Sequence, residues 1–252
     1  MLGITSLYVD EMQAQYYGMP GGMYVDEVNN ENAGGLQSGD MITAIDGTEI
    51  NGQGPHIDSS HIEQLMNRLR RLESGDVLVL AGSIPAGISD NIYKDIMDML
   101  KDKGVQIVVD ATSRLLTNVL EYNPFFIKPN QHELGDIFNV TLNTQEEVIP
   151  YALELKKMGA VNVCVSMGGK GAILVADDGN VYKAKAPDGI LKNSVGAGDS
   201  LVAGFLSGWI EKKDYEYAFR KGVATGSASA FSERLATNGE VNDLIGKVTI
   251  IR

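Results

Sequence analysis

From residue 75 onward the chain alternates short, continuously apolar runs with segments of helical periodicity, and this alternation restricts its fold more than any other feature. The segments 90–104 and 146–159 carry apolar residues at helical spacing. Runs rich in β-branched residues and ended by turn residues are typical of strands buried on both faces of a sheet. The pattern therefore predicts an α/β fold in which helices cover both faces of a parallel sheet. The apolar runs are 76–82, 105–111, 124–130 and 161–168.

The segments that follow continue this domain. Residues 171–187 are predicted to form a hairpin that turns at Asp178 and Gly179. A helix is expected to begin within 193–206, and a second helix, rich in small residues, is expected over 215–232.

The first fifty residues follow a different pattern. Segments 21–28 and 34–50 alternate short strand-like stretches with Gly-Asp and Asp-Gly turns, and no strand-helix-strand rhythm is visible. The composition changes near Gly47, and an amphipathic helix within 48–72 leads into the first buried strand. The sequence therefore predicts two parts, 1–47 and 48–252.

Charge and cysteine content restrict the class of protein. The formal net charge is −12, so a nucleic acid or an anionic membrane surface is not an expected partner. Cys164 is the single cysteine, which excludes an internal disulfide and a cysteine metal cluster and fits a reducing cytoplasm. The first residues lack the basic and apolar regions of a signal peptide, and no apolar run is long enough to span a bilayer. A cytoplasmic location is expected.

The stretch "NSVGAGDSLVAGFL" (193–206) places small residues and an acid before an apolar helix. Glycines let backbone N–H groups approach an anion closely, and a helix start adds unpaired donors and a favourable dipole. Asp199 beside them could accept a proton from an attacking hydroxyl group. A second interpretation is equally open, in which Asp199 only caps the helix and the glycines permit close packing.

Five segments in order along 48–252 resemble the ribokinase-like (phosphofructokinase B) sugar kinases, and among them the bacterial 1-phosphofructokinases and tagatose-6-phosphate kinases. The segments are "TEINGQGP" (48–55), "LAGSIPAG" (80–87), "IKPNQHEL" (127–134), "VSMGGKGA" (165–172) and "NSVGAGDSLVAGFL" (193–206). The resemblance implies a three-layer α/β domain that transfers a phosphoryl group from ATP to a sugar phosphate with Mg²⁺.

The resemblance also implies roles for single residues. Asp199 corresponds to the catalytic base, and Glu133 with Asn130 to the motif that organises magnesium and the phosphates. From the residues alone, Glu133 is also consistent with a solvated carboxylate at a helix start. The remaining implied roles are an anion hole at Gly196, Ala197 and Gly198, nucleotide contacts at Ser166, Gly168, Gly171 and Lys128, and substrate contacts at Gly82 and Ser83.

Other chemistry-bearing residues are assigned no role. His56, His61 and His132 share no spacing that suggests a metal site. Cys164 lies in an apolar run and is expected to be a buried small hydrophobe. Lys128, in contrast, is assigned a nucleotide contact by the resemblance, and its place before "PN" is also consistent with a solvent-facing lysine.

Residues 1–47 resemble part of a PDZ domain of the kind attached to HtrA-type serine proteases, through "YYGMPGGMYVDEV" and "AGGLQSGDMITAIDG". In their place the kinase family carries the segments that hold and cover the sugar phosphate, so an N-terminally truncated kinase domain is expected. A shortened sheet would expose a strand edge, which the 1–47 segment or a second copy of the chain in a homodimer would cover. The alternative function is a peptide-binding or scaffolding module without kinase turnover.

Overall fold

A computed structural model describes residues 57–85 and 87–252, together with the backbone of five short strands nearer the N-terminus. The chain divides into two compact units, Met1–Glu63 with Pro85–Ile88, and Gln64–Ile84 with Ser89–Arg252. Each unit is described by itself.

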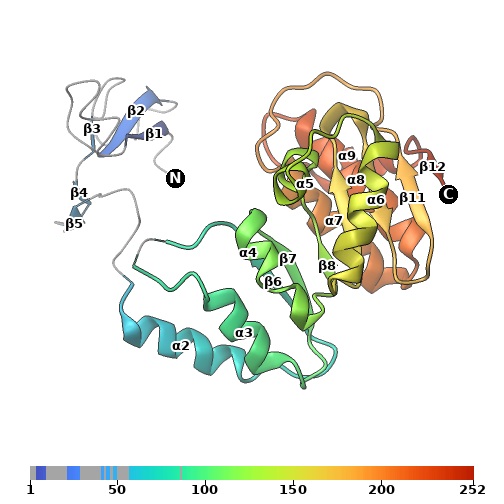
Figure 1. The fold of residues 1–252 in the computed structure, drawn as a ribbon. Helices are drawn as coiled ribbons and strands as arrows, with labels where there is room; N and C mark the ends of the chain where they lie inside the picture. The colour runs from blue at the N-terminus through green and yellow to red at the C-terminus, as the bar shows by residue number, and fades with distance from the viewer. Residues whose placement is uncertain are drawn as a thin grey trace. The chain divides into compact units, whose positions relative to one another are not determined.

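The described strands of the first unit are short and antiparallel, and this unit also includes the first residues of α2 (Ser59–Leu69) (Figure 1). β1, β2 and β3 form one sheet in that order, and β4 pairs with β5. The strand predicted within 21–28 is therefore confirmed. Most of residues 1–47 lie outside the described residues, so the PDZ-like assignment of this segment stays a prediction. The strand bounds are β1 (Ile4–Val9), β2 (Gly22–Val28), β3 (Met41–Ile42), β4 (Ala44–Ile45) and β5 (Thr48–Glu49).

A seven-stranded sheet forms the centre of the second unit, in the order β12-β11-β10-β9-β8-β7-β6. The four strands β6 to β9 are parallel, as the alternating pattern predicts. The predicted hairpin is confirmed, but it pairs with β9 in antiparallel fashion and extends the same sheet, which is therefore mixed and not wholly parallel. The strand bounds are β6 (Val77–Ala81), β7 (Gln106–Asp110), β8 (Phe126–Ile127), β9 (Val163–Ser166), β10 (Ala172–Val175), β11 (Val181–Ala184) and β12 (Ile250–Ile251).

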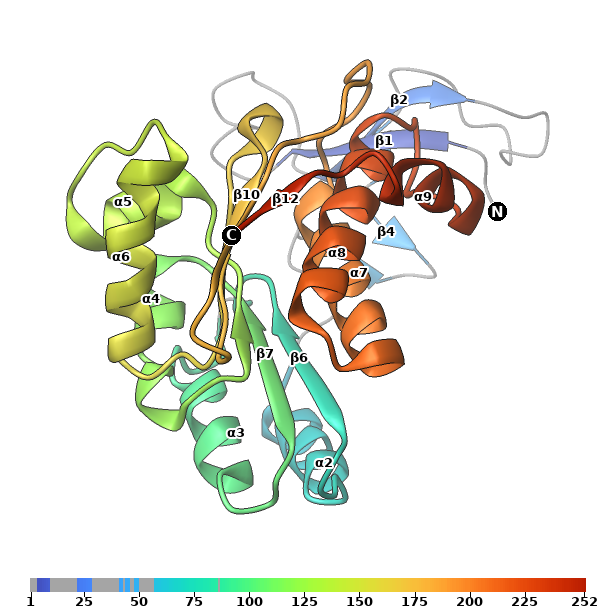
Figure 2. The ribbon, with the colours of Figure 1, turned by 90° about the vertical axis from the view of Figure 1, so that its right-hand side faces the viewer.

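Helices cover both faces of this sheet. Figure 2 shows α4, α5 and α6 on one side of it and α7, α8 and α9 on the other. This arrangement is the three-layer α/β fold that the sequence predicts. Among the residues described, no helix combines the length and apolar character that crossing a membrane requires. The helix bounds are α2 (Ser59–Leu69), α3 (Ile92–Leu100), α4 (Ser113–Thr117), α5 (Gln131–Phe138), α6 (Gln145–Lys157), α7 (Ala197–Lys212), α8 (Tyr215–Ala230) and α9 (Asn238–Ile245).

Close packing of α7 against α8 fixes the start of α7. A Cβ atom on Gly226 would lie 2.9 Å from the carbonyl oxygen of Ala197, and one on Gly222 would lie 2.9 Å from that of Leu201. Under α7, the rings of Phe205 and Phe126 stack with their centroids 4.1 Å apart. The small residues of α8 therefore let the first turns of α7 sit directly on its backbone, which restricts how the helix start can move.

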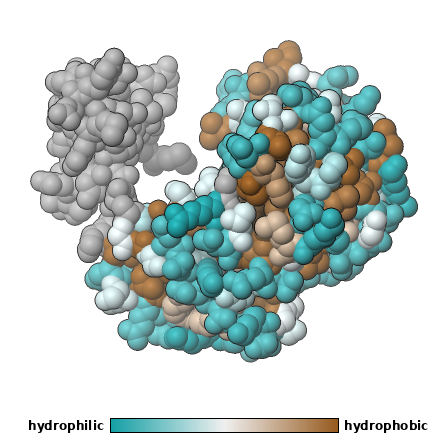
Figure 3. Space-filling view, viewed as in Figure 1, coloured by the Kyte–Doolittle hydropathy of each residue, from teal (hydrophilic) through white to brown (hydrophobic). Residues whose placement is uncertain are grey.

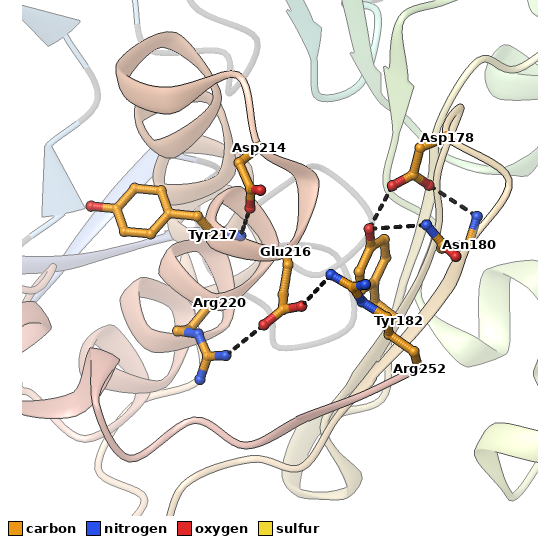
Figure 4. Close-up of polar contacts among 8 residues, drawn as sticks. All are labelled: Asp178, Asn180, Tyr182, Asp214, Glu216, Tyr217, Arg220 and Arg252. Atoms are coloured by element: carbon orange, nitrogen blue, oxygen red, sulfur yellow. Dashed lines mark hydrogen bonds and ion pairs between the residues drawn. The ribbon is translucent and has the colours of Figure 1, made fainter.

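Polar contacts join Arg252, which follows β12, to α8, and others lie within the β10–β11 hairpin (Figure 4). Arg252 forms an ion pair of 2.8 Å with Glu216 on α8, and Glu216 also pairs with Arg220 at 2.9 Å. The hydroxyl group of Tyr182 donates to Asp178 at 2.5 Å, and burial together with this bond raises the pKa of Tyr182 to about 12. These contacts lie at the β11 and β12 end of the sheet and are structural.

At the other end, β6 is the last strand of the sheet in the described part of the chain. Val79 in the middle of β6 leaves 43% of its surface exposed, although its neighbour Leu80 is buried. No other described strand pairs with the outer edge of β6, and the exposed edge expected from the sequence stays a prediction. Whether a second copy covers this edge stays a prediction.

Candidate active site

The parallel strands bring the predicted site residues to one edge of the sheet. Gly82 follows β6, Asp110 ends β7, Lys128 follows β8 and Ser166 ends β9. The N–H group of Gly82 donates to the carbonyl oxygen of Asp110 at 3.0 Å, and Asn130 forms a parallel bridge with Ser166. In open α/β sheets, ligands bind at this carboxyl edge. The fold therefore places segments from across the sequence where a ligand site is expected.

The start of α7 presents unpaired backbone donors. Gly196 is the N-cap and has a φ of 77°, a backbone conformation that glycine adopts without strain. No side chain of a described residue caps this helix. Within the described part of the chain, the N–H groups of Gly198 and Asp199 have no hydrogen-bond partner. The helix dipole adds partial positive charge at the same point, so this turn is suited to an anion.

Asp199 lies in the first turn of α7, three residues after the N-cap, and its side chain is exposed. It is not the N-cap, and its side chain makes no capping hydrogen bond, so the interpretation of Asp199 as a helix cap is wrong. An exposed carboxylate beside an anion-binding turn is placed to accept a proton from a hydroxyl group bound there.

A buried ion pair lies beside this turn. Lys128 is only 6% exposed, and its Nζ lies 3.2 Å from Oδ1 of Asp110. A Cβ atom on Gly198 would lie 3.2 Å from the same Nζ, so the ammonium group touches the anion-binding turn. Burial raises the pKa of Asp110, and the positive charge of Lys128 opposes that rise. Lys128 is therefore not the solvent-facing lysine that was the alternative.

Asp110 was not singled out from the sequence. The sequence does place an acid at the end of a buried apolar run. This position indicates a function only once the fold is known, because Lys128 after β8 then lies beside Asp110.

Asn130 and Glu133 form a capping box at the start of α5. Oδ1 of Asn130 accepts from the N–H group of Glu133 at 2.9 Å, and Oε2 of Glu133 accepts from the N–H group of Asn130 at 2.8 Å. Oε1 of Glu133 accepts no hydrogen bond from any residue described here. Glu133 therefore lies at a helix start, where it is half-buried and not fully solvated, and one of its carboxylate oxygens is still available to a cation.

A tight turn joins β9 to β10 and carries the predicted nucleotide contacts. The N–H group of Met167 donates to the carbonyl oxygen of Gly171 at 2.8 Å, and Gly171 has a φ of 92°. A Cβ atom on Gly171 would lie 2.0 Å from the carbonyl oxygen of Ala184, so only glycine fits. Around Gly168, in contrast, a Cβ atom would meet nothing within 4 Å among the described residues, which leaves room for a ligand. Ser166 lies at the start of this turn.

Gly82 and Ser83 follow β6, and a tyrosine from α3 contacts the backbone at the end of this strand. The hydroxyl group of Tyr93 donates to the carbonyl oxygen of Ala81 at 2.8 Å and lies 3.2 Å from that of Gly82. Burial raises the pKa of Tyr93, and the nearby Asp110 adds to the rise. The turn predicted to contact substrate is thus connected to the Asp110 and Lys128 pair.

Exposed apolar side chains border the start of α7. Val195 is 79% exposed, and Leu235 is 63% exposed although its Cδ2 lies 2.9 Å from where a Cβ atom of Gly196 would be. Ile190 and Leu191 on the preceding loop are 82% and 66% exposed. Figure 3 shows hydrophobic side chains gathered over that loop. The sequence interpretation missed this apolar rim, because isolated apolar residues in loops carry no periodic signal.

Among the residues given no role, Cys164 is the small buried residue that the sequence predicts. Cys164 is fully buried, and burial raises its pKa to about 12, so its thiol is unreactive at neutral pH. His61 pairs with Asp58 at the surface. His56 lies outside the described residues. No group of three or more His, Cys, Asp or Glu side chains suited to a metal ion occurs in the described part of the chain.

Comparisons with known proteins agree on one family. A family model described as pfkB family carbohydrate kinase matches residues 37–240. The 1-phosphofructokinase of Bacillus subtilis is 42% identical over 234 residues, which cover 91% of this chain and 77% of that protein. A D-tagatose-1-phosphate kinase of Bacillus licheniformis is 30% identical over 203 residues, which cover 80% of this chain and 66% of that protein. A crystal structure of phosphofructokinase-2 from Escherichia coli in complex with substrates and products is 29% identical, with a TM-score of 0.72, over 79% of this chain and 65% of that one.

These matches concern the predicted division of the chain into the parts 1–47 and 48–252. The family model begins at residue 37, within the segment expected to be PDZ-like. The chain spans between about two thirds and three quarters of the length of the proteins it matches. The boundary at residue 47 and the truncation of the kinase domain stay predictions.

Proposed function

Because the chain belongs to the pfkB family of carbohydrate kinases, we propose that it transfers the γ-phosphoryl group of ATP to a hydroxyl group of a sugar phosphate. The proposed reaction is that of a 1-phosphofructokinase, which converts fructose 1-phosphate to fructose 1,6-bisphosphate. The observation that carries the proposal is the start of α7, where unpaired N–H groups, the exposed Asp199 and the buried Lys128 meet. The relatives named above give no support to a peptide-binding module.

In the proposed step, Asp199 accepts the proton of the attacking sugar hydroxyl group. The hydroxyl oxygen forms a bond to the γ-phosphorus while the bond from that phosphorus to the β–γ bridging oxygen breaks, and ADP leaves. The exposure of Asp199 suits this role, because the carboxylate is reachable until substrate covers it.

Charge on the transferred phosphoryl group is stabilised by the turn itself. The N–H groups of Gly198 and Asp199 have no hydrogen-bond partner among the described residues, and the ammonium group of Lys128 lies next to Gly198. Such preorganised donors lower the barrier because they need no rearrangement when charge develops. Gly196 and Ala197 complete the turn, and together with Gly198 they form the proposed anion hole.

Asn130 and Glu133 are proposed to hold magnesium. Mg²⁺ in phosphoryl-transfer sites keeps several waters and is bound by one or two carboxylates and by the substrate phosphates, so a large cluster of acids is not required. The free Oε1 of Glu133 fits such a partner, and the capping box holds it in place. Bound magnesium would neutralise negative charge on the nucleotide phosphates.

The remaining predicted residues surround this point. The turn after β9, with Ser166, Gly168 and Gly171, is proposed to contact the nucleotide, and the apolar rim is proposed to cover its base. Gly82 and Ser83 are proposed to contact the sugar phosphate from the end of β6, three strands away from β9 along the same sheet edge. A homodimer and a cytoplasmic location also stay predictions from the sequence.

A coupled ADP-release assay tests the proposal and the choice of sugar. The chain is incubated with ATP and magnesium and with fructose 1-phosphate, tagatose 6-phosphate or tagatose 1-phosphate in turn. We expect saturable ADP release with the highest kcat/KM for fructose 1-phosphate. If a chain that unfolds cooperatively on heating releases no ADP with any of these sugars, the proposed function is wrong. A preference for a tagatose phosphate would keep the kinase and change its substrate.

A further inference from the structure

Two serine hydroxyl groups lie buried between α7 and α8, directly behind the proposed catalytic turn. Ser200 is 7% exposed and Ser229 is 2% exposed. Oγ of Ser229 donates to Oγ of Ser200 at 2.8 Å and accepts from the N–H group of Ala236 at 3.0 Å. One hydroxyl group of α8 thus links the first turn of α7 to the loop between α8 and α9.

The orientation of these hydroxyl groups is informative. A serine or threonine inside a helix often bonds to the carbonyl oxygen one turn earlier, as Thr225 does to Lys221 at 2.7 Å. Ser200 and Ser229 instead face each other across the helix pair. A buried hydroxyl group without a partner costs free energy, so this mutual bond favours one relative placement of the helix start and the loop.

The two segments that the hydroxyl groups connect both border the anion-binding turn. Ser200 follows the proposed base Asp199, and its N–H group makes the first hydrogen bond of α7, to the carbonyl oxygen of Gly196 at 2.9 Å. Ala236 follows Leu235, the rim residue that touches Gly196. The contact between Leu235 and Gly196 and the hydrogen bonds through Ser229 therefore tie the loop to the same helix turn twice.

We propose that Ser229, with Ser200, is a positioning residue that holds Leu235 over the anion-binding turn, so that the rim is preformed when the nucleotide binds. This inference rests on the proposed kinase function. It assigns Ser229 to ATP affinity rather than to the chemical step, with Ser200 as its hydrogen-bond acceptor. Preordering the loop lowers the entropy lost when the nucleotide binds.

Three serine substitutions test the inference by steady-state kinetics. Ser229→Ala leaves the N–H group of Ala236 without its partner, and Ser200→Ala leaves that bond intact. Ser227→Ala on the same helix is the matched control, since its hydroxyl group makes no hydrogen bond within the described residues. We expect Ser229→Ala to raise the KM for ATP about fivefold, the effect of losing one hydrogen bond, with kcat and the KM for sugar within about twofold.

Ser200→Ala and the double variant test whether both hydrogen bonds depend on Ser229. Ser200→Ala is expected to raise the KM for ATP by less than about twofold, and the double variant to match Ser229→Ala, because both bonds pass through Ser229. An unchanged KM for ATP in Ser229→Ala would overturn the inference, and so would a lower thermal midpoint with unchanged kinetics, which indicates a structural role alone. Ser227→Ala should behave as wild type.

A second measurement separates failure of this inference from failure of the proposed function. Backbone hydrogen exchange of the peptide that contains Ala236 is compared in wild type, Ser227→Ala and Ser229→Ala without nucleotide. Faster exchange in Ser229→Ala alone, by about fivefold, is expected. Equal exchange in all three would refute the positioning role even if the chain is an active kinase. If wild type shows no turnover, the proposed function fails while this readout still decides whether Ser229 orders the loop.

Discussion

Replacing Lys128 with methionine tests the buried ion pair at the proposed site most sharply. Methionine has a similar length and is apolar, so Lys128→Met removes the ammonium group and leaves most of the volume filled. Asp110, whose side chain is 15% exposed, then lies buried without its partner. The change therefore affects folding through Asp110 and ligand binding through the lost cation.

The structure sets the size of both effects. Removing one partner of a buried ion pair typically costs about 3–5 kcal/mol, because an unpaired charge stays in the interior. Burial already raises the pKa of Asp110, and loss of Lys128 removes the contribution that opposes this rise. A carboxyl group with a raised pKa binds more protons in the folded state than in the unfolded state, so stability falls as pH rises through that interval. The deficit of Lys128→Met should therefore shrink as pH falls from 7 toward 5.

The second effect is on the nucleotide. A hydrogen bond to a charged group contributes about 1.5–3 kcal/mol, so ATP affinity should fall about 10-fold to 150-fold. The double variant Lys128→Met/Asp110→Asn removes both charges and should recover most of the stability while ATP binding stays weak. Stability is measured by urea unfolding at several pH values, and ATP affinity by calorimetry. Loss of stability that Asp110→Asn does not relieve, or ATP affinity unchanged in Lys128→Met, would refute the reasoning.

Two further changes test other parts of the site, and a third tests a hydrogen-bonded carboxylate on α9. Glu133→Gln keeps the capping box, because glutamine also serves at that position, so the fold should be unchanged. Magnesium-dependent ATP binding should weaken in a titration. Unchanged magnesium dependence would assign Glu133 to the helix cap alone. Gly198→Val places a branched side chain against Nζ of Lys128, so calorimetry should show impaired ATP binding, and normal affinity would argue against the anion hole. Hydrogen bonds, chiefly from the backbone of Thr237, hold the pKa of Glu240 at about 2, below its ordinary 4.5. The stability that these hydrogen bonds provide is therefore complete above pH 4.5 and is lost as pH falls toward 2. Glu240→Gln should therefore unfold with a weaker acid dependence below pH 4.5, and thermal midpoints that run parallel to wild type would contradict this cause.

The fold could be predicted largely because its strands are short, apolar and separated by helices with clear periodicity. The predictions failed where backbone chemistry decided the outcome. The run 124–130 forms only β8 (Phe126–Ile127), because Pro129 has no N–H group to continue the ladder. The helix α5 could have been found from Asn130 and Glu133, whose spacing is that of a capping box.

Some residues of the candidate site could be predicted from the sequence, and others could not. Residues within recognisable motifs, such as Asp199 and Gly198, could be assigned roles from the sequence. Asp110, Tyr93 and Leu235 could not, because each matters only through a contact with a segment distant along the chain. Such contacts are products of tertiary packing and leave no local pattern.

The most direct test of the central claim compares wild type with Asp199→Asn in the ADP-release assay and in ATP binding. Asparagine keeps the size of the side chain but cannot accept the proton at this step. A positioned general base contributes about 10²-fold to 10⁴-fold, so kcat with fructose 1-phosphate should fall by that order. ATP should bind at least as tightly as in wild type, because a negative charge near the γ-phosphate is removed. Turnover reduced less than about tenfold, or marked weakening of ATP binding, would contradict the assignment of Asp199 as the base.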